Sequence, residues 1–173
     1  GDFVPRVALP YTQTVIRANS DITVTAAPNP SATSDSVTFT ATVAAVAPGA
    51  GLPTGDVTFT VGATVFTATL DANGVAVAQR NDLTVGVHGV SAAYPGDTNF
   101  TEAFVNGADQ DVQATLAVFM DGTGAGMLVS EPAGIDCGAT CSARFEPSSV
   151  VTVTATPLIS STFTGWDGAS GGV

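Results

Sequence analysis

One stretch of the sequence decides the fold class: Ser36-Val37-Thr38-Phe39-Thr40-Ala41-Thr42-Val43. Its apolar side chains occupy every second position and alternate with serine or threonine, so an extended chain has one apolar face and one polar face. The same alternation returns at 22–25, 56–61 and 150–155. It is typical of antiparallel strands in a sheet that buries one face and exposes the other to water. The sequence therefore predicts an all-β fold.

Turn-forming residues separate these strands at short intervals. Proline, glycine, asparagine and aspartate cluster at Pro28-Asn29-Pro30, Pro48-Gly49-Ala50-Gly51, Asp71-Ala72-Asn73-Gly74 and Pro95-Gly96-Asp97. This spacing favours a β-sandwich, and no segment carries a helical apolar stripe of useful length.

The composition excludes several classes of function. The chain has 173 residues, with four basic residues against 15 acidic ones and a formal net charge of −11. Nucleic acid is excluded as a partner, because phosphate neutralisation needs clustered lysine and arginine. No run approaches the roughly 20 apolar residues that cross a bilayer, so we expect no membrane insertion in this segment. All four basic residues are arginines, and without lysine the chain cannot form isopeptide cross-links.

The only two cysteines, Cys137 and Cys141, lie close together in the sequence. Because the chain has a single histidine, a tetrahedral zinc site is the weaker interpretation. We expect a disulfide that closes a short loop and indicates an oxidising location, extracellular or on a cell surface. By the loop-entropy model so short a loop contributes only about 2 kcal/mol, so the bond pins a tight turn rather than holding a module together.

The beginning of the sequence repeats a pattern found in its middle. Gly96-Asp97-Thr98-Asn99-Phe100 leads to a strand expected to end near Val112, and Gly1-Asp2-Phe3 leads in the same way to Tyr11-Thr12-Gln13-Thr14-Val15. In both places a new module is expected a few residues later. Residues 1–18 are therefore interpreted as the C-terminal strand region of a preceding repeat.

Residues 19–113 resemble a bacterial immunoglobulin-like (Ig-like) repeat, of the kind arranged in tandem on secreted and surface proteins. The resemblance rests on the segments 27–31, 36–43, 53–59, 68–76, 83–88 and 93–100. It implies an Ig-like β-sandwich that covers nearly a whole repeat, preceded by an Ig-like repeat that ends at residue 18.

Residues 114–173 are similar to a different module, the divergent internalin-type B repeat. The matching segments are 122–126, 130–135, 137–141, 151–157 and 163–168. In that family a further strand usually follows the tryptophan motif, which in this sequence is Phe163-Thr164-Gly165-Trp166-Asp167-Gly168. No such strand follows in this sequence, so we expect a small β-rich module that lacks its last strand.

The sequence offers no set of catalytic groups. His88 is the only histidine, so the chain cannot build a Ser-His-Asp or multi-histidine site by itself. Beside Gly86 and Gly89, it is expected to open a strand after a turn. Glycosidase chemistry needs paired carboxylates in a cleft lined with aromatic residues, whereas most phenylalanines in this chain occupy core-facing strand positions. We predict no enzyme activity, no catalytic residue and no cofactor.

Calcium is the one ion for which the sequence supplies oxygen ligands at suitable spacing. They lie two positions apart in the turns at 71–74 and 97–99, and Asp109 and Asp111 lie at the expected module junction. The turn interpretation is favoured, because Asp-Ala-Asn-Gly forms a good hairpin turn and the other acidic residues keep the surface soluble. We therefore predict no metal site, with Asp109 and Asp111 as the weak calcium candidates.

Two further motifs are given structural interpretations. Leu52-Pro53-Thr54-Gly55 is one residue shorter than a sortase sorting signal and a strand follows it, so it is interpreted as a loop. Trp166 is the first choice for a ligand contact. A large aromatic residue in a small β-module is more often its core anchor, however, and we expect Trp166 to be buried.

The sequence thus predicts a non-enzymatic stalk or fibre segment of a secreted or cell-surface bacterial multi-repeat protein. Neither junction, at 15–20 or 109–115, has a Gly, Ser or Pro run long enough for a free coil, so the modules should form a semi-rigid rod. Its partners would be neighbouring repeats or identical subunits, which could assemble into filaments by strand exchange. The alternative is an adhesin or carbohydrate-binding accessory module with a host-surface or polysaccharide ligand. Exposed aromatic residues would favour that alternative, and its ligand-binding residues are not predicted.

Overall fold

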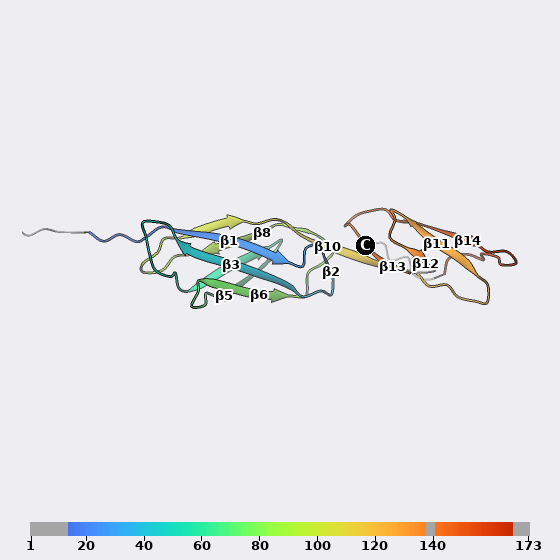
Figure 1. The fold of residues 1–173 in the computed structure, drawn as a ribbon, viewed down its shortest axis with the longest axis horizontal. Coiled ribbons are helices and arrows are strands. Elements are labelled where there is room, and N and C mark those ends of the chain that lie inside the picture. Colours follow the sequence, from blue (N-terminus) through green and yellow to red (C-terminus); the bar gives the residue numbers. More distant parts are fainter. Residues whose placement is uncertain (1–13, 138–140, 168–173) are drawn as a thin grey trace, which may run out of the picture.

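The computed structural model describes residues 14–137 and 141–167. Every regular element in this part of the chain is a β-strand, which confirms the all-β prediction. Figure 1 shows an elongated molecule in which two sandwich-like units follow one another along the long axis. The first unit contains β1 to β10 and the second contains β10 to β14.

In chain order, the strands are β1 (Ser20–Ala27), β2 (Ser31–Ala32), β3 (Val37–Ala45), β4 (Asp56–Val61), β5 (Thr64–Thr69), β6 (Val75–Arg80), β7 (Gly86–His88), β8 (Val90–Tyr94), β9 (Ala103–Asn106), β10 (Gln110–Ala117), β11 (Gly126–Glu131), β12 (Asp136–Cys137), β13 (Ser142–Phe145) and β14 (Thr152–Pro157).

The first unit is a sandwich of two antiparallel sheets with one continuous core. One sheet has the order β1-β3-β6 and the other has the order β5-β4-β8-β9. The apolar positions of the alternating stretch in β3 are all buried, as predicted: Val37, Phe39, Ala41 and Val43. Phe66 packs edge-on against Phe39 across the two sheets, with ring centroids 5.5 Å apart. The predicted period of two therefore builds this core.

The strand predicted over 150–155 is β14, which begins and ends two residues later. Among the described residues, β14 pairs with β11 alone and so lies at the edge of the sheet β12-β11-β14. Pro157 is the last residue of β14, and an edge strand tolerates proline because only one side of the strand must supply hydrogen bonds. The edge position therefore explains how the strand can extend to Pro157.

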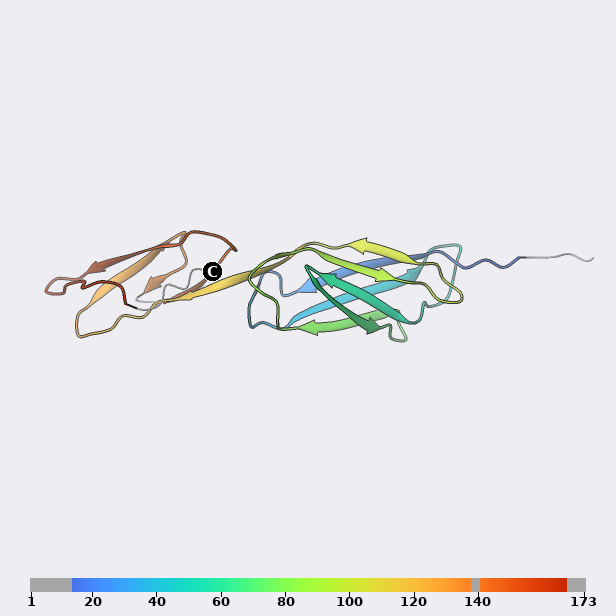
Figure 2. The same cartoon turned by 180° about the vertical axis from the view of Figure 1, so that it is seen from behind.

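β10 belongs to both units. Its first half pairs with β7, and it also pairs in parallel with β2 through Val112 and Gln113. Its second half, Ala114 to Ala117, pairs with β13. The strand expected to end near Val112 thus continues to Ala117, and Figures 1 and 2 show it crossing from one unit into the next.

The second unit has a much smaller core. The sheet β12-β11-β14 faces the pair β10–β13. Among its described residues, the buried apolar side chains are Leu128, Ile135, Cys137 and Phe145. The unit therefore has little apolar volume with which to bury its own aromatic residues.

Candidate functional site

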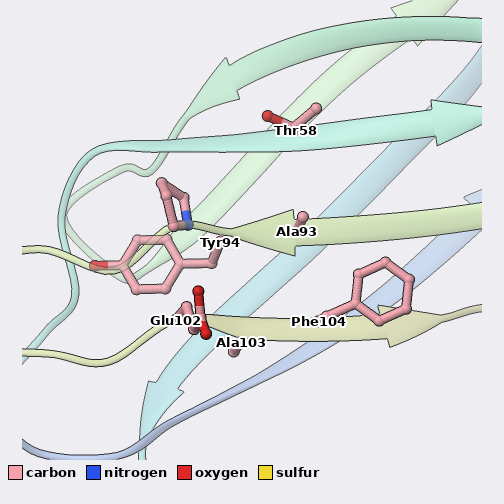
Figure 3. A pocket seen from close by; sticks show the side chains of 7 residues that line it. Thr58, Ala93, Tyr94, Glu102, Ala103 and Phe104 are labelled. Atoms are coloured by element: carbon pink, nitrogen blue, oxygen red, sulfur yellow. The ribbon is translucent and has the colours of Figure 1, made fainter.

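The outer face of the sheet β5-β4-β8-β9 carries a shallow hollow (Figure 3). Its volume is about 320 Å³, and it is lined by Thr58, Ala93, Tyr94, Pro95, Glu102, Ala103 and Phe104. Thr58 lies opposite Ala93 and Ala93 lies opposite Phe104, so small side chains form the floor beside an exposed ring. Phe104 is 64% exposed. One carboxylate, one hydroxyl and one ring can contact a ligand, but they form no acid and base pair.

Tyr94 also lines this hollow, although it is almost fully buried. Its hydroxyl donates to the Thr54 carbonyl oxygen over 3.0 Å, which holds the Leu52–Gly55 loop in place. Burial, with a smaller effect of the Asp97 carboxylate, raises the pKa of Tyr94. The prediction that Leu52-Pro53-Thr54-Gly55 is a loop is confirmed, since these residues lie between β3 and β4 and belong to no strand.

Asp97 organises the turn beside this loop. Its Oδ1 accepts hydrogen bonds from the backbone N–H groups of Asn99 (2.7 Å) and Phe100 (2.8 Å), and its Oδ2 accepts two from Thr54. Desolvation opposes ionisation of this carboxyl, but these hydrogen bonds outweigh it and hold the pKa of Asp97 well below its ordinary value. Both oxygens are thus engaged in turn structure, which agrees with the favoured interpretation.

The turn at 71–74 is built in the same way. Asp71 Oδ1 accepts hydrogen bonds from the backbone N–H groups of Val75 (2.9 Å) and Asn73 (2.8 Å), and these lower the pKa of Asp71. Gly74 has a φ of 76°, and a Cβ there would lie 2.6 Å from the Val43 carbonyl oxygen. The hairpin turn therefore requires glycine at this position.

The two weak calcium candidates lie at the start of β10. The Asn29 side chain binds the backbone on both sides: its Nδ2 donates to the Asp109 carbonyl oxygen (2.8 Å), and its Oδ1 accepts from the Asp111 N–H (3.0 Å). Asp111 Oδ1 is buried and has no hydrogen-bond partner. Burial and the neighbouring Glu146 carboxylate raise the pKa of Asp111. In residues 14–137 and 141–167 no group of three or more His, Cys, Asp or Glu could hold a metal. The absence of a metal site, with Asp109 and Asp111 as the weak calcium candidates, stays a prediction.

Side chains of the second unit contact the first unit around β10. The Arg144 Nη1 and Asp35 Oδ2 atoms lie 3.4 Å apart and form an ion pair. Gln113 Nε2 donates to Glu146 Oε1 over 2.7 Å. Neither contact is predicted from the sequence, because both join residues far apart in the chain and depend on the pairing of β10 with β13.

Cys137 and Cys141 form a disulfide, as expected from their spacing. Cys137 is buried in the core of the second unit and Cys141 packs against that core. The bond therefore joins two positions that both belong to the packing of the second unit.

His88 ends β7 rather than opening a strand, so that part of the prediction is wrong. Its position is set by pairing with Gln110 of β10, which the local glycines do not reveal. One ring nitrogen, Nε2, lies 2.7 Å from the Thr84 carbonyl oxygen. This contact is structural, and it brings no nucleophile or carboxylate to the ring.

The prediction that Trp166 is a buried core anchor is wrong. Trp166 is 57% exposed and packs edge-on against Phe163, which is 43% exposed, with ring centroids 5.1 Å apart. The small core of the second unit lies around Phe145 instead. The expectation for phenylalanine holds for Phe39 and Phe59, whereas Phe104 and Phe119 are exposed.

The paired sheets, their alternating strands and the single core define the first unit as an Ig-like β-sandwich. A family model for the bacterial Ig-like domain (group 3) matches residues 24–113, more than half of the chain. The chain therefore belongs to this family, and the Ig-like part of the resemblance is confirmed. The match leaves out residues 114–173, so their similarity to an internalin-type B repeat stays a prediction.

Neither a curated protein nor a solved structure matches the chain. Across the residues that the structure describes, no helix has the length and apolar character needed to span a membrane.

Proposed function

We propose that this chain is a non-enzymatic structural segment, a stalk or fibre, of a secreted or cell-surface bacterial multi-repeat protein. The family supports a structural or adhesive module of this kind. The disulfide between Cys137 and Cys141 supports an extracytoplasmic location, because such bonds persist in oxidising compartments.

The observation that carries the proposal is the shared strand β10. A single strand is hydrogen-bonded into both units, so no free coil separates them. Two hydrogen-bonded ladders on one strand resist bending far better than a flexible linker does. The elongated arrangement in Figure 1 is therefore the shape of a rod segment.

X-ray scattering in solution tests this proposal. The native chain should give the maximum dimension expected of the extended arrangement, and a short Gly/Ser insertion between Gln113 and Ala114 should broaden the distance distribution. The same insertion between Gly122 and Thr123, in a loop of the second unit, is the matched control and should leave the distribution unchanged. A native chain as flexible as the Gln113 insertion variant would contradict the rod.

Assembly into filaments by strand exchange is a finer part of the proposal. Within residues 14–137 and 141–167, β14 pairs only with β11, so its other edge could accept a strand from an identical subunit or a neighbouring repeat. Thr154→Lys, at the middle of this edge strand, should abolish concentration-dependent assembly in sedimentation, whereas Thr23→Lys in β1 should leave it intact. A native chain that stays monomeric while fully folded would rule out the exchange.

One observation favours a second candidate function, an adhesin or carbohydrate-binding accessory module. Phe163 and Trp166 form an exposed aromatic pair, the feature that a sugar-stacking surface requires. Binding to insoluble polysaccharides, followed by tryptophan fluorescence, tests it. Trp166→Ala should remove binding and Phe104→Ala, in the other unit, should not; no binding by the native chain would exclude this candidate.

A further inference from the structure

β10, the last strand of the Ig-like unit, contains one buried glutamine and one buried valine. Gln110 is fully buried, and its Nε2 lies 3.1 Å from the Pro28 carbonyl oxygen and 3.1 Å from Ser31 Oγ. Val112 is also fully buried within the core. This strand therefore closes the sandwich with a polar contact and an apolar contact, two positions apart.

The same residue types recur at the same spacing near the beginning of the sequence. A phenylalanine is followed after ten positions by glutamine and after two more by valine. The pattern occurs as Phe100, Gln110 and Val112 and again as Phe3, Gln13 and Val15. A Gly-Asp pair precedes both phenylalanines, directly before Phe3 and with two residues between at Phe100. The second occurrence thus has the residues that close an Ig-like sandwich.

The two valines have opposite surroundings. Val15 is 89% exposed and Ile16 is 82% exposed, although the chain just after them is well held. The Ala18 N–H donates to the Asn99 carbonyl oxygen (2.8 Å), and the Thr101 N–H donates to the Ala18 carbonyl oxygen (2.9 Å). Two adjacent branched apolar side chains are therefore displayed to water by an anchored backbone.

The surface around them is concave. Val15, Ile16, Gly51, Leu52 and Asn99 are among the residues that line a hollow of about 400 Å³ at the end of the sandwich. Leu52 is itself 56% exposed. The chain before β1 enters the sandwich at one end, and β10 leaves it at the other (Figure 1).

We propose that the surface formed by Val15, Ile16 and Leu52 receives the end of a further Ig-like unit of the same kind, encoded earlier in the same chain, whose closing strand contains Gln13 and Val15. The inference rests on the proposed tandem arrangement and names the partner of this surface. In that unit Val15 takes the place that Val112 takes in the first sandwich. The first unit would then share a strand with a neighbouring unit at each of its two ends.

The experiment supplies the proposed preceding unit from the chain's own sequence. A second copy of residues 19–97 is placed directly before Gly1, so that Phe3 follows Pro95 after four residues, as Phe100 does in the native chain. Val15→Asp is then made in this extended chain and in the native chain. The matched control is Thr14→Asp, which places at position 14 the residue type that Asp111 has between Gln110 and Val112.

The added repeat should fold cooperatively and resist thermolysin. Val15→Asp should raise its rate of proteolysis at least about tenfold in the extended chain, because a charge would enter the core. The same change should be silent in the native chain, where the side chain is exposed, and Thr14→Asp should be silent in both. An added repeat that stays unfolded, or one that folds but ignores Val15→Asp, would overturn the inference.

A second copy of the native chain is the competing occupant of this surface. A native dimer in light scattering that Val15→Asp dissolves would also overturn the assignment. The stalk proposal can fail separately. If Val15→Asp acts as expected but scattering shows that the extended chain folds back on itself, the assignment of Val15 to a preceding unit is supported and the stalk proposal is contradicted.

Discussion

The two units differ in how they are held together. Among the residues that the structure describes, the first has 17 buried residues in one core, whereas the second has four, together with a disulfide and the second half of β10. A small module cannot bury enough apolar area to offset the entropy of ordering its chain. The first unit can therefore fold on its own core, whereas the second depends on its disulfide and on its neighbour.

The largest effect is expected from the core of the first unit. Phe39→Ala should lower its free energy of unfolding by about 3–5 kcal/mol, because it removes a fully buried ring that contacts Phe59 and Phe66. Urea unfolding measures the loss. Val77→Ala, on the exposed face of β6, is the control and should change little. Equal losses from both variants would show that the core does not stabilise this unit.

The disulfide should matter next, and only to the second unit. Replacing Cys137 and Cys141 together by alanine should destabilise the second unit by about 2 kcal/mol through the freed loop. Hydrogen exchange in β11 and β13 reports on that unit, while exchange in β3 reports on the first and should stay unchanged. If β3 exchanged faster to the same extent, the two units would unfold as one and the comparison would fail.

Acid should act in opposite directions on the first unit and on the junction. The pKa of Asp97 is lowered from 3.8, so its contribution to the first unit is present above that pH and is lost as the pH falls below it. The pKa of Asp111 is raised from 3.8, so its contribution at the junction is present in acid and is lost as the pH rises through the raised value.

Carboxyl NMR titrations and amide exchange between Ala114 and Ala117 measure the two effects. Asp111→Asn should make the exchange of these β10 amides independent of pH after correction for the intrinsic rate. Asp109→Asn, an exposed neighbour two positions away, should not. A junction whose exchange slows as the pH rises would contradict the sign expected for Asp111.

The smallest effect is expected from the ion pair between the units. Arg144 and Asp35 are partly exposed, with side chains that are 48% and 29% accessible, so their interaction should amount to less than about 1 kcal/mol. A double-mutant cycle with Arg144→Met and Asp35→Asn measures the coupling. A coupling much larger than this would mean that side-chain charge, rather than the shared strand, holds the junction.

The sequence pattern was sufficient for the fold of the first unit, because a period of two needs only local information. Val37, Phe39, Ala41 and Val43 face the core as their spacing predicts. The expectation that Trp166 is a core anchor was wrong, because the burial of this side chain depends on how much apolar volume the rest of its unit provides. That quantity is a property of the packed unit and is not visible in the local sequence.

The polar residues of the junction were the hardest to predict. Gln110 contacts Pro28 and Ser31, about 80 positions earlier, and only the assembled sandwich brings them together. A glutamine flanked by strand-forming residues gives the one available signal, since a polar side chain at a core-facing position needs a buried partner. The repeat of that glutamine at position 13 strengthens the signal.

The shared strand also fixes the length of the chain at this junction. Val112 faces the first core and Leu116 packs against the second, so side chains an even number of positions apart serve both sandwiches from the same face of one strand. Inserting or deleting a single residue between them would turn one of the two sets of side chains outward. A change in the number of residues should therefore be tolerated less well in this strand than at 119–124, which lies between β10 and β11.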